Sequence, residues 1–300
     1  MVTATAMRMT SVPPGLLLRG TEQLTVSSLG EEHRAEVMEF LSARPIHTVM
    51  MVGLIRDNGL VSEHNRGTFY GCRTEDGELE GVGLIGHATR LETRTDRALA
   101  ALARQAQAYT RTHMIMGEQE RISKFWSHYA EDGQEMRLAC RELLFELKPP
   151  VAVREEVFEL RRATARDLEL IMPAQAQMAF EESGVNPLEV DPEGFRRRCL
   201  RRIEQGRTWV LIEDGRLLFK TEIVSDTPDV NYLEGIYVDP DERGKGYGLQ
   251  CLSQLTRMLL RHTRSVCILV NERNTAAHAF YRKAGFKFRC VYDTIFLAQK

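Results

Sequence analysis

The chain of 300 residues carries 40 lysines and arginines against 42 aspartates and glutamates, a formal net charge of −2, and 43% of its residues are hydrophobic. This balance is typical of a globular protein with room for two domains, and it lacks the basic excess expected of proteins that bind nucleic acid or anionic membranes. The early apolar run Leu16 to Leu18 is far shorter than a signal-peptide core or a membrane span, so we expect a cytoplasmic protein whose segment from Met1 to Gly20 is a loose start.

The first half is predicted to begin with an amphipathic helix and to end with strands. Its elements in chain order are a helix from Glu31 to Ala43, a hairpin turned at Asp76-Gly77, a helix from Thr95 to Thr110, a strand from His113 to Met116, a helix carrying Phe125-Trp126, and strand-like segments from Leu138 to Leu147. Asp-Gly between strand-like runs is a strong hairpin signal.

A break at Lys148-Pro149-Pro150 divides the chain, because paired prolines continue neither a helix nor a sheet ladder. The second half repeats the order of elements: a helix from Ala165 to Phe180, a hairpin at Asp214-Gly215, a helix from Gly246 to His262, a strand from Val266 to Val270, a helix carrying Phe280-Tyr281, and a strand from Lys287 to Leu297. We predict two domains, residues 1–150 and 151–300, each an α+β unit with a mixed central sheet flanked by helices. Internal duplication and a chance match of element order are both open explanations.

The segment from Gly81 to Gly86 has the GxGxxG spacing of a dinucleotide-binding loop. Such a loop needs a strand before it and a helix after it. Here the glycines fall within the strand that follows Asp76-Gly77, and His87 to Leu91 has no helical pattern. A glycine-containing strand is the preferred interpretation.

The second half contains a strand, a glycine-rich loop and a helix in direct succession. The strand is predicted from Tyr232 to Val238, turn residues follow, and Arg243-Gly244-Lys245-Gly246-Tyr247-Gly248 precedes leucines at helical spacing. Glycines leave room for a pyrophosphate to approach the backbone N–H groups, and a helix N-terminus adds a favourable dipole. We predict a pyrophosphate site with Arg243 and Lys245 beside it; a glycine-rich turn with solvated basic residues is the alternative.

These residues resemble the GNAT superfamily of N-acetyltransferases. The family's R/Q-x-x-G-x-G/A motif is met by Arg243, Gly246 and Gly248, and its downstream pattern Asn-x-x-Ala-x-x-Phe-Tyr-x-x-x-Gly-Phe is met from Asn274 to Phe286. The resemblance covers roughly Val157 to the C-terminus and implies an acetyl-CoA-dependent N-acetyltransferase. It implies cofactor contacts from the strand, the loop, the helix start and two asparagines: Ile236, Tyr237, Val238, Arg243, Gly244, Lys245, Gly246, Tyr247, Gly248, Leu249, Asn271 and Asn274.

The expected reaction needs a base, because an amine with a pKa of about 10.4 is protonated at neutral pH. The period of two along the predicted strand places Glu234 on the same face as Ile236. The Tyr-Leu-Glu stretch resembles that of spermidine/spermine acetyltransferases, which implies that Glu234 is the base, directly or through water; a strand-edge charge or an ion pair is the alternative. The resemblance also implies that Tyr281 protonates the leaving thiolate, with a core aromatic as the alternative, and that the Val238 N–H polarises the carbonyl.

Two opposite signals leave the charge of the acceptor open. Glu181 and Glu182 lie where GNAT proteins shape the acceptor pocket and would suit a cationic amine, although a solvated loop explains them equally well. A dense basic helix would suit an anionic acceptor or partner, or is simply a solvated face; its arginines are Arg196, Arg197, Arg198, Arg201 and Arg202. We expect a primary amine on a small molecule or on a protein as the acceptor.

The first half has no counterpart of the glycine loop. At that position Glu92 to Arg97 contains no glycine and two acidic side chains, which would repel a pyrophosphate. We therefore expect a GNAT-like first half that has lost cofactor binding and serves as scaffold, acceptor-site wall or homodimer surface. The alternative to an enzyme is a non-catalytic sensor that binds acyl-CoA.

Cysteines and histidines show no metal-ligand spacing. The 6 cysteines and 8 histidines are scattered, and several cysteines sit inside apolar runs. This pattern predicts buried free thiols in a reducing compartment and no metal site.

Overall fold

A computed structural model describes residues 24–298, so the expected loose start at Met1 to Gly20 lies outside the described residues. The first half contributes β1 (Thr25–Ser28), η1 (Glu31–His33), α1 (Arg34–Ser42), α2 (Pro45–Asn58), η2 (Glu63–Asn65), β2 (Gly67–Arg73), β3 (Leu79–Gly86), β4 (Ala88–Thr93), α3 (Asp96–Gln107), β5 (Met114–Glu118), α4 (Gln119–Tyr129) and β6 (Met136–Leu147). The second half contributes β7 (Arg161–Arg162), η3 (Ala165–Asp167), α5 (Leu168–Ser183), α6 (Pro187–Val190), α7 (Pro192–Glu204), β8 (Thr208–Glu213), β9 (Arg216–Asp226), β10 (Val230–Val238), η4 (Pro240–Glu242), α8 (Tyr247–Leu259), β11 (Ser265–Asn271), α9 (Thr275–Lys283) and β12 (Lys287–Leu297).

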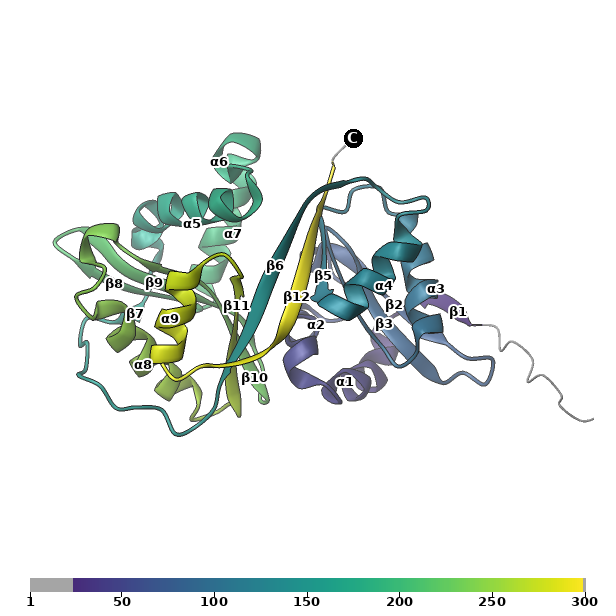
Figure 1. Cartoon of the computed structure of the whole chain (residues 1–300), viewed down its shortest axis with the longest axis horizontal. Coiled ribbons are helices and arrows are strands. Elements are labelled where there is room, and N and C mark those ends of the chain that lie inside the picture. Colours follow the sequence, from purple (N-terminus) through teal and green to yellow (C-terminus); the bar gives the residue numbers. More distant parts are fainter. Residues whose placement is uncertain (1–23, 299–300) are drawn as a thin grey trace, which may run out of the picture.

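The strands form one mixed sheet with helices on both faces, which confirms the predicted architecture (Figure 1). The strand order is β1-β2-β3-β4-β5-β12-β6-β11-β10-β9-β8-β7. Both Asp-Gly hairpins are present, joining β2 to β3 and β8 to β9. At the second hairpin Asp214 (φ 49°) and Gly215 (φ 76°) both have the positive φ of a type I′ turn, which matches the twist of the flanking strands. The GxGxxG segment is strand β3, as expected.

The sheet runs without a break through both halves of the chain. β6, from the first half, lies between β11 and β12 and pairs antiparallel with both. β12, the last strand of the chain, also pairs with β5 of the first half. Figure 1 shows β6 and β12 side by side at the centre of the molecule. A domain boundary at residue 150 stays a prediction, but each half completes its sheet with a strand of the other.

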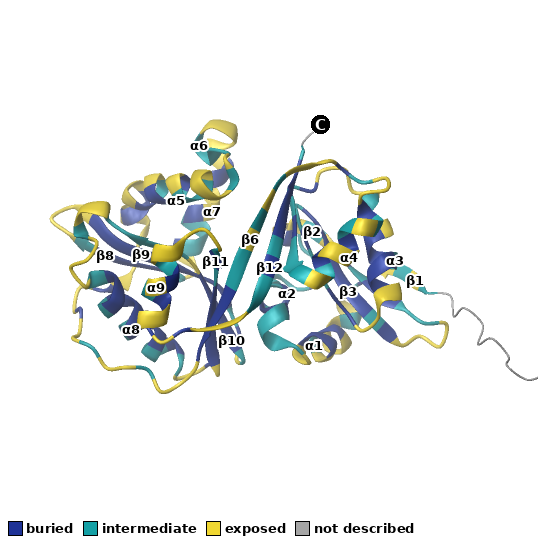
Figure 2. Ribbon diagram, viewed as in Figure 1, coloured by how far each residue is buried: buried dark blue, intermediate teal, exposed yellow. Residues whose placement is uncertain are grey.

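Different helices cover the two faces of the second half's sheet. On one face α8 and α9 pack over β10, β11 and β6, where Leu255, Ile268 and Phe145 share an apolar cluster. On the other face α5 and α7 pack on β8 and β9, and α2 of the first half packs on β10, β11 and β6. Figure 2 shows β6 buried at its C-terminal end, where these helices cover it, and exposed at its start. A helix from the first half therefore forms part of the second half's core.

The sequence analysis missed α2, and its packing gives the reason. Met51 and Ile55 belong to the core of the first half, whereas Val49 packs with Tyr232 and Cys267 of the second half. A helix that is buried on two sides has no continuous polar face, so it lacks the amphipathic signal that identifies surface helices.

Candidate active site

The geometry of the candidate site begins where β10 separates from β11. The two strands pair only between Val230–Leu233 and Ser265–Ile268. On its other side β10 pairs with β9, with an irregularity between Glu234 and Tyr237. Residues 235–238 consequently have backbone groups on the β11 side without a ladder partner. These are the positions at which the resemblance implies pantetheine contacts, through Ile236, Tyr237 and Val238.

A buried lysine that the sequence analysis did not identify supports this irregularity. Lys220 on β9 is completely buried, and its Nζ donates to the Gly235 carbonyl at 3.2 Å and to the Gln175 side chain. Its ion pair with Glu222 at 3.5 Å supplies the counter-charge that a buried ammonium needs. The signal in the sequence was a lysine directly after the apolar run Leu217 to Phe219, within a predicted strand.

The glycine loop leads into the N-terminus of α8. Within the described residues, the backbone N–H groups from Gly244 to Gly248 donate no hydrogen bond. Free N–H groups at the start of a 13-residue helix form an arrangement that favours an anion. Arg243 donates from Nε to the Val238 carbonyl at 3.2 Å, and Lys245 pairs with Glu242 at 2.9 Å. The charge of Lys245 is therefore partly neutralised by a carboxylate beside the loop.

The two motif glycines are required for different physical reasons. Gly246 has φ +102°, and a Cβ added there would meet nothing within 4 Å. Gly248 has ordinary helical geometry, but its added Cβ would lie 2.7 Å from Val238 Cγ2. The expectation that both glycines leave space for phosphate is therefore supported in geometry only at Gly246. Gly248 allows α8 to pack closely on β10.

The other residues expected to contact the cofactor around α8 and α9 have defined partners. Leu249 is buried in the core, and Tyr247 is packed at its edge. The Asn274 side chain caps α9 by accepting from the Ala277 N–H at 3.0 Å. Asn271 accepts from the Arg273 N–H at 2.9 Å. Contacts of these residues with a cofactor stay a prediction, and the structure assigns both asparagine oxygens a local structural function.

Tyr281 lies on α9 in contact with the core that faces β10. Its side chain is 8% exposed and packs against Phe145, Phe280 and Phe286. Burial raises the pKa of its phenol above the ordinary value. The hydroxyl makes no hydrogen bond to any residue in the described part of the chain, so it is available to a ligand.

Glu234 lies on β10 directly before the irregularity. The alternation expected for this strand is wrong here, because Ile236 packs on the α8 side with Leu233 whereas Tyr232 packs on the α2 side. The extra residue introduced by the bulge shifts the alternation. Burial and the neighbouring Glu222 raise the pKa of Glu234, and the cations Arg202, Arg90 and Lys220 oppose that shift.

The side chain of Glu234 is both accessible and enclosed. Its surface is exposed to water, yet burial is the largest cause of its raised pKa. The side chain therefore contacts water although protein atoms surround much of it. A carboxylate in that environment is a stronger base than an ordinary surface glutamate, and it has access to a proton on a ligand.

Two more carboxylates approach Glu234 from distant parts of the chain. Glu142 on β6 and Glu182 at the end of α5 both raise the pKa of the Tyr232 phenol, as Glu234 does. Burial raises the pKa of Glu182 to about 8, with Glu234 and Glu142 as further causes. The sequence analysis singled out Glu182 but missed Glu142, because nothing in the sequence shows that β6 crosses into the second half.

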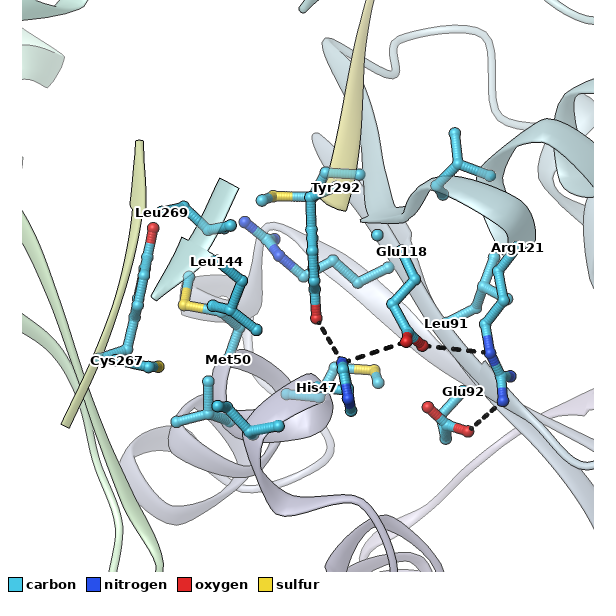
Figure 3. Close-up of a pocket in the computed structure, with 18 residues that line it drawn as sticks. His47, Met50, Leu91, Glu92, Glu118, Arg121, Leu144, Cys267, Leu269 and Tyr292 are labelled. Carbon is cyan, nitrogen blue, oxygen red and sulfur yellow. Dashed lines mark hydrogen bonds and ion pairs between the residues drawn. The ribbon is translucent and has the colours of Figure 1, made fainter. Parts of the chain in front are cut away.

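A small cavity lies behind these groups, between α2 and the sheet. Its volume is about 40 Å³, enough for one or a few water molecules. Figure 3 shows His47, Tyr292, Glu118 and Arg121 joined in a chain of contacts along it. His47 Nδ1 lies 2.9 Å from the Tyr292 hydroxyl, and Arg44 donates to Glu118 at 2.5 Å. This network fixes α2 of the first half against strands of both halves.

The same network contains a set of potential metal ligands. Ligand atoms of His47, Glu118 and Cys290 lie within 4.8 Å of one another. Glu118 is engaged by Arg44 and Arg121, and His47 by Tyr292, so protein partners already satisfy these groups. Two arginines on the carboxylate also oppose a cation there. The expectation of a protein without a metal stays a prediction.

In the first half, the segment that corresponds to the glycine loop is engaged in contacts with the protein's own side chains. Glu92 pairs with Arg44 and Arg121, both at 3.1 Å. Thr95 caps α3 by accepting from the Ala98 N–H at 3.2 Å. The helix N-terminus therefore already has a partner, and the loss of cofactor binding in the first half stays a prediction.

Comparisons with known proteins agree with this geometry. Residues 174–286 match the model of the acetyltransferase (GNAT) family. The chain is 37% identical over 60 residues to the peptidyl-lysine N-acetyltransferase YjaB of Salmonella typhimurium, a segment that covers 19% of this chain and 36% of that protein. The match thus spans about a third of the relative's length.

Solved structures extend the likeness to both halves. An X-ray structure of a Drosophila protein has a TM-score of 0.68 at 11% identity and covers 91% of this chain and 98% of its own. A tandem GNAT protein from the clavulanic acid biosynthesis pathway has a TM-score of 0.57 at 14% identity and covers 93% of this chain and 100% of its own. Residues 174–286 thus resemble the acetyltransferase (GNAT) family, and the two halves together share the fold of the tandem GNAT protein. Within residues 24–298, no helix is long and apolar enough to cross a membrane.

Proposed function

We propose that the chain transfers an acetyl group from acetyl-CoA to a primary amine on a small molecule or a protein. The observation that carries this proposal is the combination of a strand that separates from its neighbour at residue 234 and a helix N-terminus with free N–H groups. Together they offer backbone groups to pantetheine and to a pyrophosphate. The lysine acetyltransferase activity in the name of the Salmonella relative supports an amine acceptor.

The proposed division of roles follows from where each group lies. Glu234 removes a proton from the acceptor ammonium, directly or through water, and the neutral amine then attacks the thioester carbonyl. The Val238 N–H stabilises the carbonyl oxygen as negative charge develops on it. Tyr281, whose phenol is protonated at neutral pH, protonates the departing thiolate. Residues 1–150 are proposed as a GNAT-like wall of the acceptor site without a cofactor of their own.

Cytoplasmic location is part of the same proposal. All six cysteines are free thiols, and Cys72, Cys199, Cys251 and Cys267 are buried. Free buried thiols are characteristic of proteins that work under reducing conditions.

Release of free thiol from acetyl-CoA, measured across a library of amines, tests the function. We expect turnover that depends on the acceptor and saturates with it. Saturable binding of acetyl-CoA with no acceptor-stimulated thiol release would contradict the proposal and favour an acyl-CoA sensor.

A further inference from the structure

The irregularity in β10 interrupts its regular pairing with β9. One regular pair is Glu234 opposite Glu222, and the next is Tyr237 opposite Lys220. Between these pairs β10 contains two residues and β9 only one. An extra residue of this kind disrupts the ladder locally, so backbone groups near it need other partners.

Side chains of β9 supply such partners. Lys220 Nζ donates to the Gly235 carbonyl at 3.2 Å, and Thr221 Oγ1 donates to the Glu234 carbonyl, also at 3.2 Å. Both β9 residues are fully buried, so these donors are shielded from water. Two successive carbonyls of β10 are therefore held by side chains at the point where the strand separates from β11.

The ammonium group of Lys220 has a position that the protein itself determines. Nζ donates to the Gln175 side chain on α5 and pairs with Glu222 on β9 at 3.5 Å. A lysine ammonium has three donors, and a carbonyl, an amide and a carboxylate oxygen lie around it here. The contact with Gly235 is thus supported from α5 and from β9 together.

The backbone at Gly235 allows this contact. Its φ of +63° lies in the left-handed region, which residues with a side chain seldom adopt. A Cβ added there would lie 2.9 Å from Lys220 Nζ and 3.2 Å from Gln175 Oε1. Glycine is therefore needed both for the turn of the chain and for the close approach of the lysine.

The bond from Lys220 also decides where the next N–H points. A trans peptide directs its carbonyl and its N–H to opposite sides, and the bond between residues 235 and 236 is trans. Because Lys220 holds the Gly235 carbonyl, the Ile236 N–H faces away from the lysine. The pairing of β10 with β11 has already ended at Leu233. This N–H is therefore the first of the separated segment, and its direction is fixed from the β9 side.

We propose that Lys220 is a positioning residue for the acyl donor: by holding the Gly235 carbonyl, it orients the backbone groups of residues 236–238 that bind pantetheine and the thioester. This role rests on the proposed acetyltransferase function. Lys220 is buried and acts on the donor only through the backbone of β10, so it is not a catalytic residue. Its role also differs from that of the glycine loop, which is proposed to bind the pyrophosphate of the same molecule.

Two ligands that share the nucleotide end test the proposal. Acetyl-CoA contains pantetheine and the thioester, whereas adenosine 3′-phosphate 5′-diphosphate ends at the pyrophosphate. Calorimetry measures the affinity of both for the wild type and for Lys220→Met, which keeps the length of the side chain but removes its donors. We expect the variant to bind acetyl-CoA roughly ten- to a hundredfold more weakly, as for loss of a hydrogen bond from a charged group. Binding of the nucleotide should stay within about twofold of the wild type, because the glycine loop is intact.

Further variants separate this effect from a loss of folding. Lys220→Met leaves Glu222 buried without its counter-charge, which destabilises the folded state. The double variant Lys220→Met/Glu222→Gln removes the ion pair as a whole and should show the same selective loss. Gly235→Ala, whose Cβ would displace the lysine, should show it as well. Lys124→Met, at an exposed lysine of α4, is the matched control and should bind both ligands as the wild type does.

Two results would overturn the positioning role of Lys220. One is an equal weakening of both ligands in Lys220→Met and in the double variant, and the other is an unchanged affinity of both variants for acetyl-CoA. Failure of the wild type to bind acetyl-CoA would instead overturn the proposed function. A selective loss of acetyl-CoA binding without thiol release for any amine would support the role of Lys220 and overturn the transfer reaction alone.

Discussion

Asn271, the last residue of β11, is paired with Glu142 on β6, a strand from the other half of the chain. The pairing continues to Val266 opposite Leu147, and Phe145 of the same strand lies in the core beneath α8 and α9. The expected cofactor residues at the end of β11 thus depend on a strand that precedes the Pro149-Pro150 break. The second half contains the whole glycine loop and its strand, but the strand β6 that stabilises the neighbouring β11 comes from the first half.

Separate expression of residues 151–300 should therefore give a chain that does not fold cooperatively. It lacks β6, so β11 and β12 lose their shared neighbour and the core loses Phe145. Residues 131–300, which restore β6, are the matched control and should recover part of the structure. Circular dichroism during urea unfolding measures the cooperativity of unfolding of both fragments. A sharp transition in the 151–300 fragment would show that the second half folds without β6 and would contradict the prediction.

Substitutions of the two motif glycines should separate cofactor binding from packing. Gly246→Trp points into open space, so we expect it to abolish binding of coenzyme A while lowering stability by only about 1–2 kcal/mol for the positive φ. Gly248→Ala should lower stability further, because its Cβ would strike Val238. Calorimetric binding and thermal unfolding measure the two effects. Retained affinity in Gly246→Trp would contradict the placement of the pyrophosphate.

Glu234→Gln should lower kcat without weakening the binding of acetyl-CoA. In the wild type, the raised pKa of Glu234 places the acid limb of the rate profile above the ordinary glutamate value, and activity falls as pH drops through it. The variant should lose that limb and retain only a slow rate that rises with pH. An unchanged pH profile would remove Glu234 from the role of base.

The same variant should be more stable than the wild type at neutral pH. A carboxyl group whose pKa is raised on folding stabilises the folded state at low pH, and that contribution is lost as pH rises through the folded pKa. Glutamine removes the cost of the charged form, so the melting temperature should rise. A lower melting temperature would indicate that Glu234 serves in a stabilising ion pair.

Tyr281→Phe should reduce kcat by roughly one to three orders of magnitude, as expected for loss of a general acid. Stability should change little, because the hydroxyl has no hydrogen-bond partner among the described residues. Tyr129→Phe is a useful control, since that hydroxyl accepts from the Gln134 N–H and is remote from the glycine loop. Wild-type turnover in Tyr281→Phe would reduce this residue to a packing function.

Asp167→Asn should destabilise the fold in a pH-dependent way. The Arg161 guanidinium holds the pKa of Asp167 at about 2, and the Thr164 N–H at 2.7 Å supports the carboxylate. A depressed pKa contributes stability above the unfolded value, and that contribution disappears as pH falls towards 2. We expect a loss of about 1–2 kcal/mol at neutral pH, and much less near pH 2 to 3.

Urea unfolding at both pH values measures the effect. Glu169→Gln, an exposed partner of Arg196, should cost under about 0.5 kcal/mol at either pH and serves as the control. Equal destabilisation by Asp167→Asn at both pH values would show that the hydrogen bonds to the neutral side chain, rather than the charge, stabilise this turn.

The local patterns of the chain were sufficient for most of its elements. Alternation, helical periodicity and Asp-Gly turns predicted the helices later seen as α3, α5, α8 and α9, and the strand from Lys287 to Leu297 has the predicted bounds. Contiguous residues also carry the glycine loop, since its strand, turn and helix follow one another along the chain. They were not sufficient for α2, because a helix that is buried on two sides lacks the amphipathic pattern of a surface helix. They also failed for Ile236, because the bulge in β10 places its side chain on the opposite face of the sheet from the one that strict alternation predicts.

By itself, the sequence determined the GNAT motif, the glutamate that precedes it and the tyrosine that follows it, because each lies within a short segment whose local geometry is encoded by its neighbours. Only the tertiary structure decided that β6 lies between β11 and β12, that Glu142 joins Glu182 and Glu234, and that α2 of the first half packs into the core of the second. Those relationships join residues that lie far apart in the sequence, in several cases by more than about a hundred positions. Such contacts depend on how strands pair and helices pack across the whole fold, and no local sequence pattern encodes that arrangement.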